Sequence, residues 1–422
     1  MTALEHVHDL AAFVRASPSS FHAAAEGARR LTEAGFVAQD ETEAWDASPG
    51  GHFLVRDGAL LAWRVPEGAG PTTPFRVVGA HTDSPTFKLK PRPDLGAHGW
   101  QQLGVEVYGG PLLNSWLDRE LGLAGRLVLT DGSLQLLRTE ALMRIPQLAI
   151  HLDRAVNEEG VRLDKQQHTA PVWSVGHRGL SVLDHLAGVA GCLRSEVDGY
   201  DLVAFDTAAP AVFGPQQEFF ASGRLDNLTS VHAALTALLA APESGHVELV
   251  AAFDHEEVGS GSRSGAAGPV LADVVTRTLT ALGATTDERH RSMARSVCLS
   301  ADAGHAVHPN YPGRHDPVNQ PVLNGGPLLK LNANQRYSSD AAGTGLWRRA
   351  CRRAGVPTQE FVSHNAVPCG STIGPLTATR LGITTIDVGP PLLSMHSARE
   401  LAGTEDPWLL ARAIEAFFTL ES

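Results

Sequence analysis

The sequence predicts an α/β fold in which a core built on a parallel sheet is interrupted by a β-rich inserted domain. Three apolar segments, 75–80, 247–253 and 296–301, are dominated by β-branched and small residues, as in strands buried on both faces of a sheet. Apolar residues also recur at helical spacing, for example at Val231, Ala234, Leu235, Leu238 and Leu239. Alternating strand and helix patterns of this kind are typical of an α/β core.

The pattern changes between residues 94 and 205. Short alternating segments there are separated by Gly-Gly and Asp-Gly turns, which favour antiparallel hairpins. A chain of 422 residues is long enough for two domains. We therefore predict a discontinuous core domain, 1–92 and 206–422, and an inserted β-rich domain, 93–205.

The remaining elements follow from local signals. Residues 3–35 show helical periodicity with a break at Ser17-Pro18, and helices are also expected after Asp226 and over 269–283 and 340–354. Asp226 stands where a helix N-cap would, and Asp406-Pro407 has the chemistry of an N-cap and first turn. Further strands are expected over these segments: 52–55, 60–65, 104–108, 126–129 and 382–388.

Composition restricts the partners. The net charge of −12 argues against nucleic acid or an anionic membrane as the main partner. Four cysteines without a Cys-x-x-Cys pair indicate neither a disulfide framework nor a thiolate metal site. The sequence shows no signal peptide and no apolar run long enough to cross a membrane, so we expect a cytoplasmic protein.

Two adjacent glutamates, Glu256 and Glu257, follow the apolar segment 247–253 directly, and glycines come next. Adjacent residues at a strand end point in different directions, so one carboxylate can bind a metal while its neighbour faces a metal-activated water. A solvated acidic turn is the alternative for such a pair taken alone.

Other acids and histidines occupy comparable positions. The carboxyl ends of parallel strands meet at one edge of the sheet, so residues that follow different strands can share one cleft. Two metal ions that share a bridging carboxylate need a histidine and a carboxylate each, together with a free carboxylate as general base and a group that orients a histidine. The sequence supplies this set: His81, Asp83, Asp226, Glu256, Glu257, Asp302 and His396.

Competing catalytic motifs are absent from the sequence. The His-Glu-x-x-His pattern fails because Gly259 stands where its second histidine belongs. Neither a Gly-x-Ser-x-Gly nucleophile elbow nor a Gly-x-x-x-x-Gly-Lys phosphate loop occurs.

The motifs together resemble those of the aspartyl aminopeptidases, which are dinuclear zinc exopeptidases. The resemblance covers nearly the whole chain in order. Its runs are GAHTDSP (79–85), GRLDN (223–227), DHEEVGS (254–260), SAD (300–302), NANQRY (332–337), PCGSTIGP (368–375) and SMHS (394–397).

The resemblance implies a zinc-peptidase-like α/β/α sandwich core with two Zn2+ per subunit, for which Co2+ or Mn2+ are substitutes. It implies that Asp226 bridges the ions and that Glu256 is the general base, with Asp83 orienting His81. The remaining ligands would be His81 and Asp302 for one ion, and Glu257 and His396 for the other.

The resemblance also implies three substrate-binding residues. Lys330 and Tyr337 would lie near the substrate, with Lys330 pairing with an acidic side chain. His168, in the inserted domain, would reach the site of a neighbouring subunit and help to bind the oxyanion. The inserted domain would mediate dimers within a homo-oligomer, a dodecamer. Ala366 departs from the family pattern, which often has an acidic residue there, and puts the fine substrate preference in question.

The expected function is removal of N-terminal Asp or Glu from peptides with a free N-terminus. Two alternatives remain open: a related dinuclear enzyme, either an aminopeptidase of neutral specificity or a deacylase, and a self-assembling protein without catalysis.

Overall fold

Four parallel strands lie side by side in the largest sheet of the computed structural model, which describes residues 1–177 and 179–421. Their order in the sheet is β13, β4, β14, β18. The bounds are β4 Phe75–His81, β13 Val247–Phe253, β14 Val297–Ala301 and β18 Thr384–Gly389. Almost every residue in these strands is buried, which confirms the prediction of a parallel sheet covered on both faces.

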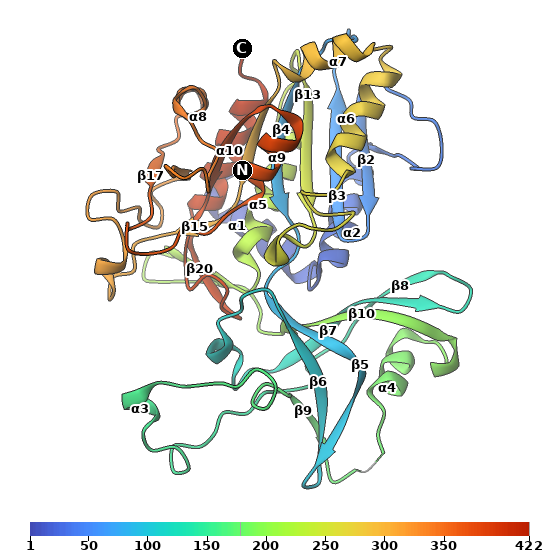
Figure 1. The fold of residues 1–422 in the computed structure, drawn as a ribbon, viewed down its shortest axis with the longest axis vertical. Helices are drawn as coiled ribbons and strands as arrows, with labels where there is room; N and C mark the ends of the chain where they lie inside the picture. Colours follow the sequence, from blue (N-terminus) through green and yellow to red (C-terminus); the bar gives the residue numbers. More distant parts are fainter. Residues whose placement is uncertain (178, 422) are drawn as a thin grey trace.

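Five shorter or outer strands complete a nine-stranded sheet. β3 pairs with β13 and β16 pairs with β18, both antiparallel. The outer strands are β1 Val37–Ala38, β2 Gly50–Arg56, β3 Ala59–Val65, β16 Leu328–Lys330 and β17 Gln359–Phe361. The four parallel strands are therefore central, and their carboxyl ends open on one edge of the sheet (Figure 1).

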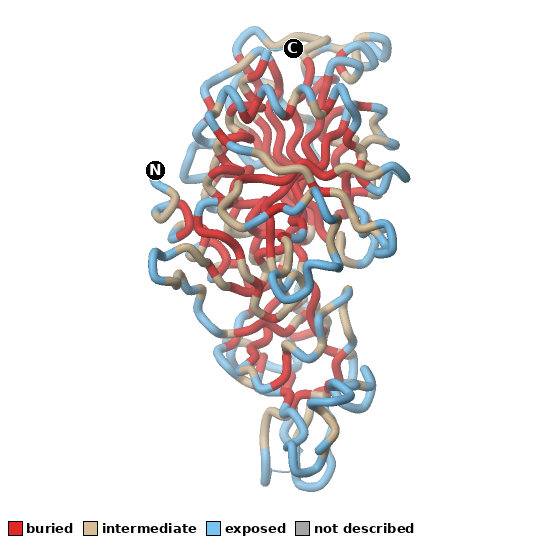
Figure 2. The backbone as a smooth tube through the Cα atoms, turned by 90° about the vertical axis from the view of Figure 1, so that its left-hand side faces the viewer, coloured by how far each residue is buried: buried red, intermediate tan, exposed pale blue. Residues whose placement is uncertain are grey.

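Helices cover both faces of this sheet. Alternate residues of each central strand point to opposite faces, so that Val78 and Val250 join one core while Val77 and Leu249 join the other. The first core is covered by α1 Ala3–Ala16, α2 Ser20–Glu33, α5 Leu225–Ala240, α8 Ala341–Ala354 and α10 Asp406–Phe418. The second is covered by α6 Val270–Ala281, α7 Thr286–Met293 and α9 Ile373–Leu381. The buried strands of this sheet lie in the middle of the upper part of the molecule in Figure 2, with helices on both sides, as the predicted α/β/α sandwich requires.

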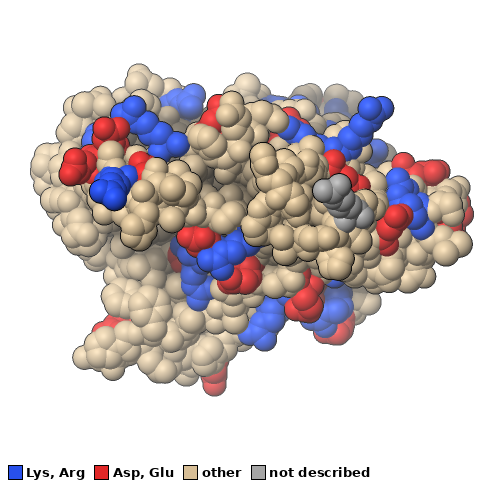
Figure 3. Space-filling view, turned by 90° about the horizontal axis from the view of Figure 1, so that it is seen from below, with Lys and Arg blue, Asp and Glu red and all other residues tan. Residues whose placement is uncertain are grey.

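A second sheet of six antiparallel strands forms the lower part of the molecule in Figure 1. It has a separate core, to which α4 Val182–Ala190 contributes. Its strands are β5 Thr86–Ala97, β6 Trp100–Tyr108, β7 Leu121–Leu129, β8 Leu134–Arg138, β9 Val172–Val175 and β10 Val197–Asp206. β5 thus begins before the boundary predicted at residue 93. Seen from this end, the surface carries basic and acidic side chains close together (Figure 3).

A third sheet of five short strands borders the nine-stranded sheet. Its strands are β11 Ala211–Phe213, β12 Phe219–Ser222, β15 Gly304–His305, β19 Pro391–Leu393 and β20 Glu400–Gly403. β19 and β20 pair antiparallel and hold between them the segment that carries His396.

Neither aspartate predicted in a helix-capping position caps a helix. Asp226 has non-helical backbone angles within α5, and its carboxylate faces His81 and His396. Asp406 is the first residue of α10, as predicted, but its carboxylate accepts hydrogen bonds from the backbone N–H groups of Asn324 and Gly326. Both carboxylates are buried and serve tertiary contacts in place of local capping.

No helix in residues 1–177 and 179–421 combines the length and the apolar character that a membrane crossing requires.

Replacing Asp406 by alanine is expected to destabilise the fold. The substitution leaves two backbone N–H groups without their acceptor, at about 1–3 kcal/mol each. We expect the midpoint of thermal unfolding to fall by about 2–7 °C. Asp287, exposed in the first turn of α7, is the matched control, and its alanine variant should unfold within about 1 °C of wild type. Equal midpoints for both variants would contradict a structural role for Asp406.

Candidate metal centre

The predicted ligands meet in one cavity at the carboxyl edge of the central sheet. The cavity has a volume of about 670 Å3. His81 ends β4, Asp302 follows β14, and Asp226 comes from the start of α5. Its lining includes every predicted ligand and the predicted general base: His81, Asp226, Glu256, Glu257, Asp302 and His396. The tertiary structure thus brings together residues that the sequence separates by more than three hundred positions.

Asp226 lies between the two histidines. Its Oδ1 is 3.3 Å from Nε2 of His81, and its Oδ2 is 3.5 Å from Nε2 of His396. On the first side, His81 Nε2 is also 3.6 Å from Oδ1 of Asp302. On the second side, His396 Nε2 is 3.4 Å from Oε2 of Glu257. The Asp226 carboxylate therefore presents one oxygen to the pair His81 and Asp302 and the other oxygen to the pair Glu257 and His396, as a carboxylate that bridges two metal ions does.

The far nitrogen of each histidine faces a backbone carbonyl. Nδ1 of His81 is 3.0 Å from the carbonyl oxygen of Asp83, and Nδ1 of His396 is 3.0 Å from that of Gly110. A carbonyl only accepts, so each Nδ1 must carry the proton. In a neutral ring this leaves the Nε2 lone pair facing the carboxylates, the tautomer that binds metal.

The donor groups fit divalent cations. Asp226 Oδ1 and Glu257 Oε1 are buried and make no hydrogen bond within residues 1–177 and 179–421. Burial raises the pKa of Glu257 well above its ordinary value, and the nearby charge of Asp226 adds to this effect. Although burial opposes its charge, the neighbouring carboxylates, Asp226 foremost, raise the pKa of His81. Both shifts show an excess of buried negative charge, which a cation would neutralise.

Asp83 supports the paired glutamates as well as His81. Its Oδ1 accepts from the backbone N–H of Glu256 at 3.0 Å, and its Oδ2 accepts from that of Glu257 at 3.1 Å. The hydroxyl of Tyr108 donates to Oδ2 at 2.8 Å. The contact to His81 Nδ1 comes mainly from the Asp83 carbonyl, since its carboxylate lies farther away at 3.4 Å. Asp83 therefore ties β4 to the turn that carries both glutamates.

Comparison with known proteins identifies the family. The family model for the aminopeptidase I zinc metalloproteases (M18) matches residues 13–418. The chain belongs to the M18 family. A Streptomyces coelicolor protein named "Probable M18 family aminopeptidase 2" is 54% identical over 419 residues, covering 98% of this chain and 97% of that protein.

Solved structures agree with this assignment. A chain in the cryo-EM structure of the Ape4 and Nbr1 complex is 35% identical with a TM-score of 0.95, covering 99% of this chain and 86% of that chain. The mApe1 dodecamer of S. cerevisiae gives 30% identity and a TM-score of 0.86, covering 98% of this chain and 96% of that chain. The M18 family is one of zinc metalloproteases, and the histidine and carboxylate donors described above are ones that zinc accepts.

Glu400 is a supporting residue of this site that sequence analysis did not find. Glu400, at the start of β20, accepts from the backbone N–H of Asp226 at 2.9 Å and from that of His396 at 2.7 Å. It is fully buried, and burial raises its pKa to about 8. Glu400 therefore joins the two segments that carry Asp226 and His396. Only its position four residues after a candidate ligand could have drawn attention to it.

The predicted substrate residues fall in different places. Lys330 and Tyr337 line the metal cavity, with the ammonium 5.3 Å from the centre of the tyrosine ring. Lys330 is only 1% exposed, and its Nζ donates to the carbonyl of Ala303 at 2.7 Å, so it is not an ordinary surface amine. His168 is exposed on the inserted domain and lines a separate cavity there. Within one chain, the structure does not bring His168 to the metal cavity.

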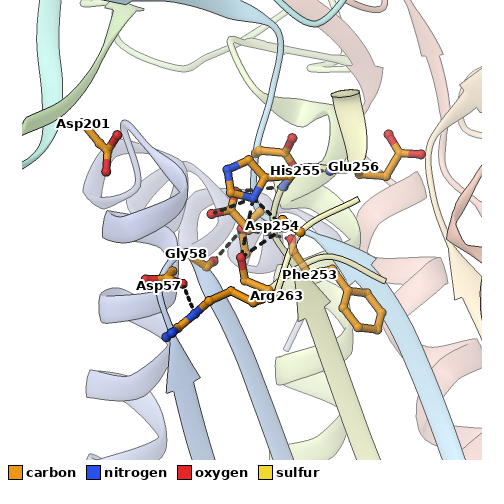
Figure 4. A network of polar contacts seen from close by, with 12 residues as sticks. Asp57, Gly58, Asp201, Phe253, Asp254, His255, Glu256 and Arg263 are labelled. Carbon is orange, nitrogen blue, oxygen red and sulfur yellow. Dashed lines mark hydrogen bonds and ion pairs between the residues drawn. The ribbon is translucent and has the colours of Figure 1, made fainter. Parts of the chain in front are cut away.

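The loop that follows β13 is held by hydrogen bonds and ion pairs on the side away from the metal cavity. Figure 4 shows Glu256 pointing to the opposite side from Asp254 and His255. Nδ1 of His255 is 3.0 Å from the hydroxyl of Ser262, within the same loop. Arg263 pairs with Asp57 at 2.8 Å, and Arg126 of the inserted domain pairs with the same carboxylate at 2.9 Å. Asp57 therefore links the loop that carries the glutamates to the inserted domain.

Replacing Asp83 by asparagine is expected to lower kcat/KM for peptide hydrolysis about 10–100-fold, the usual cost of losing a partner that orients metal ligands. The amide keeps the shape of the side chain but supplies one acceptor oxygen where two backbone N–H groups need one each. Steady-state kinetics would measure the loss. Asp198→Asn, on the exposed side of β10, is the control and should retain wild-type kinetics. Full activity in Asp83→Asn would show that the two hydrogen bonds from the backbone of Glu256 and Glu257 to Asp83 are not needed for catalysis.

Proposed function

We propose that this protein is a dinuclear zinc aminopeptidase that removes acidic residues from the N-termini of peptides. The observation that carries the proposal is the position of Asp226, whose two oxygens each face a histidine and, beyond it, a further carboxylate. The first ion would be held by Asp226, His81 and Asp302, and the second by Asp226, Glu257 and His396. When bound, zinc supplies Lewis acidity and lowers the pKa of a coordinated water.

Glu256 is the proposed general base. It lines the cavity beside the ligand groups, and burial raises its pKa to about 7. A carboxylate with a pKa near neutrality can accept a proton from the attacking water and later return it to the leaving amine. The hydrogen bond from its backbone N–H to Asp83 holds Glu256 in position for both transfers.

The substrate preference is assigned to Lys330 and Tyr337. The Lys330 ammonium donates to the Ala303 carbonyl and lies 3.8 Å from Oδ2 of Asp302, which leaves a further N–H group for a carboxylate of the substrate. The tyrosine ring beside it adds a polar hydroxyl to the same wall of the cavity. One of the two metal ions would also meet the free α-amine, which restricts cleavage to chain ends.

We also propose that subunits assemble through the inserted domain, residues 93–205, into a dodecamer built from dimers. The mApe1 structure of S. cerevisiae is a dodecamer. In this chain, a loop of the inserted domain exposes Leu148 (58%), Ile150 (45%) and Leu152 (75%), an apolar surface suited to a second copy. His168 lines the cavity beside this loop, where it would be carried toward a neighbouring subunit. All four cysteines are free, which suits the reducing cytoplasm that we propose as its location.

Two substitutions separate catalysis from metal binding. Glu256→Gln should retain zinc but lower kcat about 100–10,000-fold, because the amide cannot accept the proton. Asp226→Asn should lose zinc, because the bridging group becomes neutral. Zinc content and turnover measured on the same samples test both expectations. Substantial activity in Glu256→Gln would remove that residue from the base role.

Specificity is tested with peptides that differ only in the first residue. Wild type should hydrolyse an N-terminal Asp substrate faster than a Leu substrate, while an N-acylated amino acid should not react. Lys330→Met should lower kcat/KM for the Asp substrate by at least about tenfold, since a buried charge pair is lost, with a smaller change for the Leu substrate. Equal rates for Asp and Leu in wild type would instead indicate an enzyme of neutral specificity, and cleavage of the N-acylated compound would indicate a deacylase.

A further inference from the structure

The two halves of the metal centre are held by different parts of the molecule. His81 is the last residue of β4, and the backbone N–H of Asp302 donates to the carbonyl of Val388 in β18 at 2.9 Å. The central sheet therefore fixes this half. Glu257 lies in a short helical turn, Glu256–Val258, and His396 lies between β19 and β20. Neither of these residues belongs to the central sheet.

The second half is instead held by residues 108–115, the segment that leaves β6 of the inserted domain. Nδ1 of His396 donates to the carbonyl of Gly110 at 3.0 Å, and the backbone N–H of Leu112 donates to the carbonyl of His396 at 2.8 Å. The backbone N–H of Ala398 donates to Oγ of Ser115 at 2.9 Å. The 108–115 segment thus contacts the His396 loop at three points and sets the direction of the ring.

The same segment packs against Glu257. Gly109 has a φ of +68°, and a Cβ placed on it would lie 3.1 Å from Cβ of Glu257 and 3.4 Å from its carbonyl oxygen. A larger residue would be strained by the backbone angle and would press on the glutamate. The hydroxyl of Tyr108 reaches Asp83, which in turn accepts from the backbone N–H of Glu257. Both residues unique to the second half therefore depend on the 108–115 segment.

We propose that the inserted domain, through residues 108–115, sets how tightly the Glu257–His396 half of the centre holds its cation, whereas the central sheet sets the His81–Asp302 half. This inference rests on the proposed two-zinc site. A displacement of the inserted domain changes the orientation of His396 and the position of Glu257, while β4 and β14 keep His81 and Asp302 in place. The placement of the inserted domain would thereby determine whether the second cation is bound.

The test measures zinc retained by the full-length, zinc-loaded protein across a series of EDTA concentrations, with metal counted per chain by mass spectrometry. In Gly109→Ala, one of the two ions should be lost at an EDTA concentration about 10–100-fold lower than in wild type, as for other lost partners of metal ligands. The other ion should be retained as in wild type. Gly104→Ala is the matched control, because Gly104 lies in β6, which ends just before Gly109, and its added Cβ meets nothing closer than 3.6 Å.

Tyr108→Phe gives a second test that preserves packing, should Gly109→Ala fail to fold. It removes only the hydroxyl that donates to Asp83, and we expect about a tenfold shift for the same ion, as for loss of a hydrogen bond to a charged group. Circular dichroism of each variant shows whether it is folded.

Double variants assign the affected ion. In the Asp302→Asn background, which retains the ion of the Glu257–His396 half, Gly109→Ala should still weaken zinc binding. In the Glu257→Gln background, which has already lost that ion, Gly109→Ala should have no further effect. Two zinc ions in wild type with equal weakening of both, or of neither, in Gly109→Ala and Tyr108→Phe would overturn the inference and leave the two-zinc proposal intact. A single zinc per wild-type chain would overturn the two-zinc proposal and this inference with it.

Discussion

The structure depends on the concentration of buried negative charge at one edge of its central sheet. Asp226, Glu257 and Asp302 converge there on two histidines, at distances of 3.3 to 3.6 Å. Carboxylates in such proximity and shielded from water repel one another unless a positive charge lies between them. The centre is therefore a cost to folding that bound zinc relieves, and the surrounding hydrogen bonds keep its donors in place until it does.

Two buried carboxylates carry this support without being ligands themselves. Asp83 joins β4 to the turn of the paired glutamates, and Glu400 joins the segments of Asp226 and His396. Asp406 acts farther away, where it holds the loop at Asn324. Asp83, Glu400 and Asp406 each accept hydrogen bonds from two backbone N–H groups, one with each carboxylate oxygen. Each of them therefore fixes the position of the main chain more than that of a side chain. Ligand geometry in this protein is thus controlled chiefly through the backbone.

The segment that joins the inserted domain to the core lies beside the metal cavity. The inserted domain leaves and re-enters the core beside the metal cavity, so β6 ends next to Glu257 and His396. The central sheet provides rigid positions for His81 and Asp302, which lie at strand ends. In the two-zinc centre that we propose, one half would be fixed by the central sheet and the other held by contact with the inserted domain.

Sequence reasoning found the strands and their chemistry because both have local signals. Apolar runs at 75–80, 247–253 and 296–301 end in polar residues, and a parallel sheet must bring such ends to one edge. It misread Asp406 as a helix cap because a local signal for capping was present while its true partners lie eighty residues away. It did not find Glu400, Tyr108 or Gly110, since they act through backbone groups or through a single hydroxyl and belong to no motif.

The sequence by itself determined the α/β class, the change in pattern from which an inserted domain is predicted and the set of candidate metal-binding side chains. Those features follow from periodicity and from residue type, which are properties of the chain alone. Only the tertiary structure decided that Asp226 lies between the two histidines, that Lys330 is buried in the wall of the cavity and that the inserted domain contacts half of the centre. These facts depend on distances between segments far apart in the chain, which local pattern does not encode.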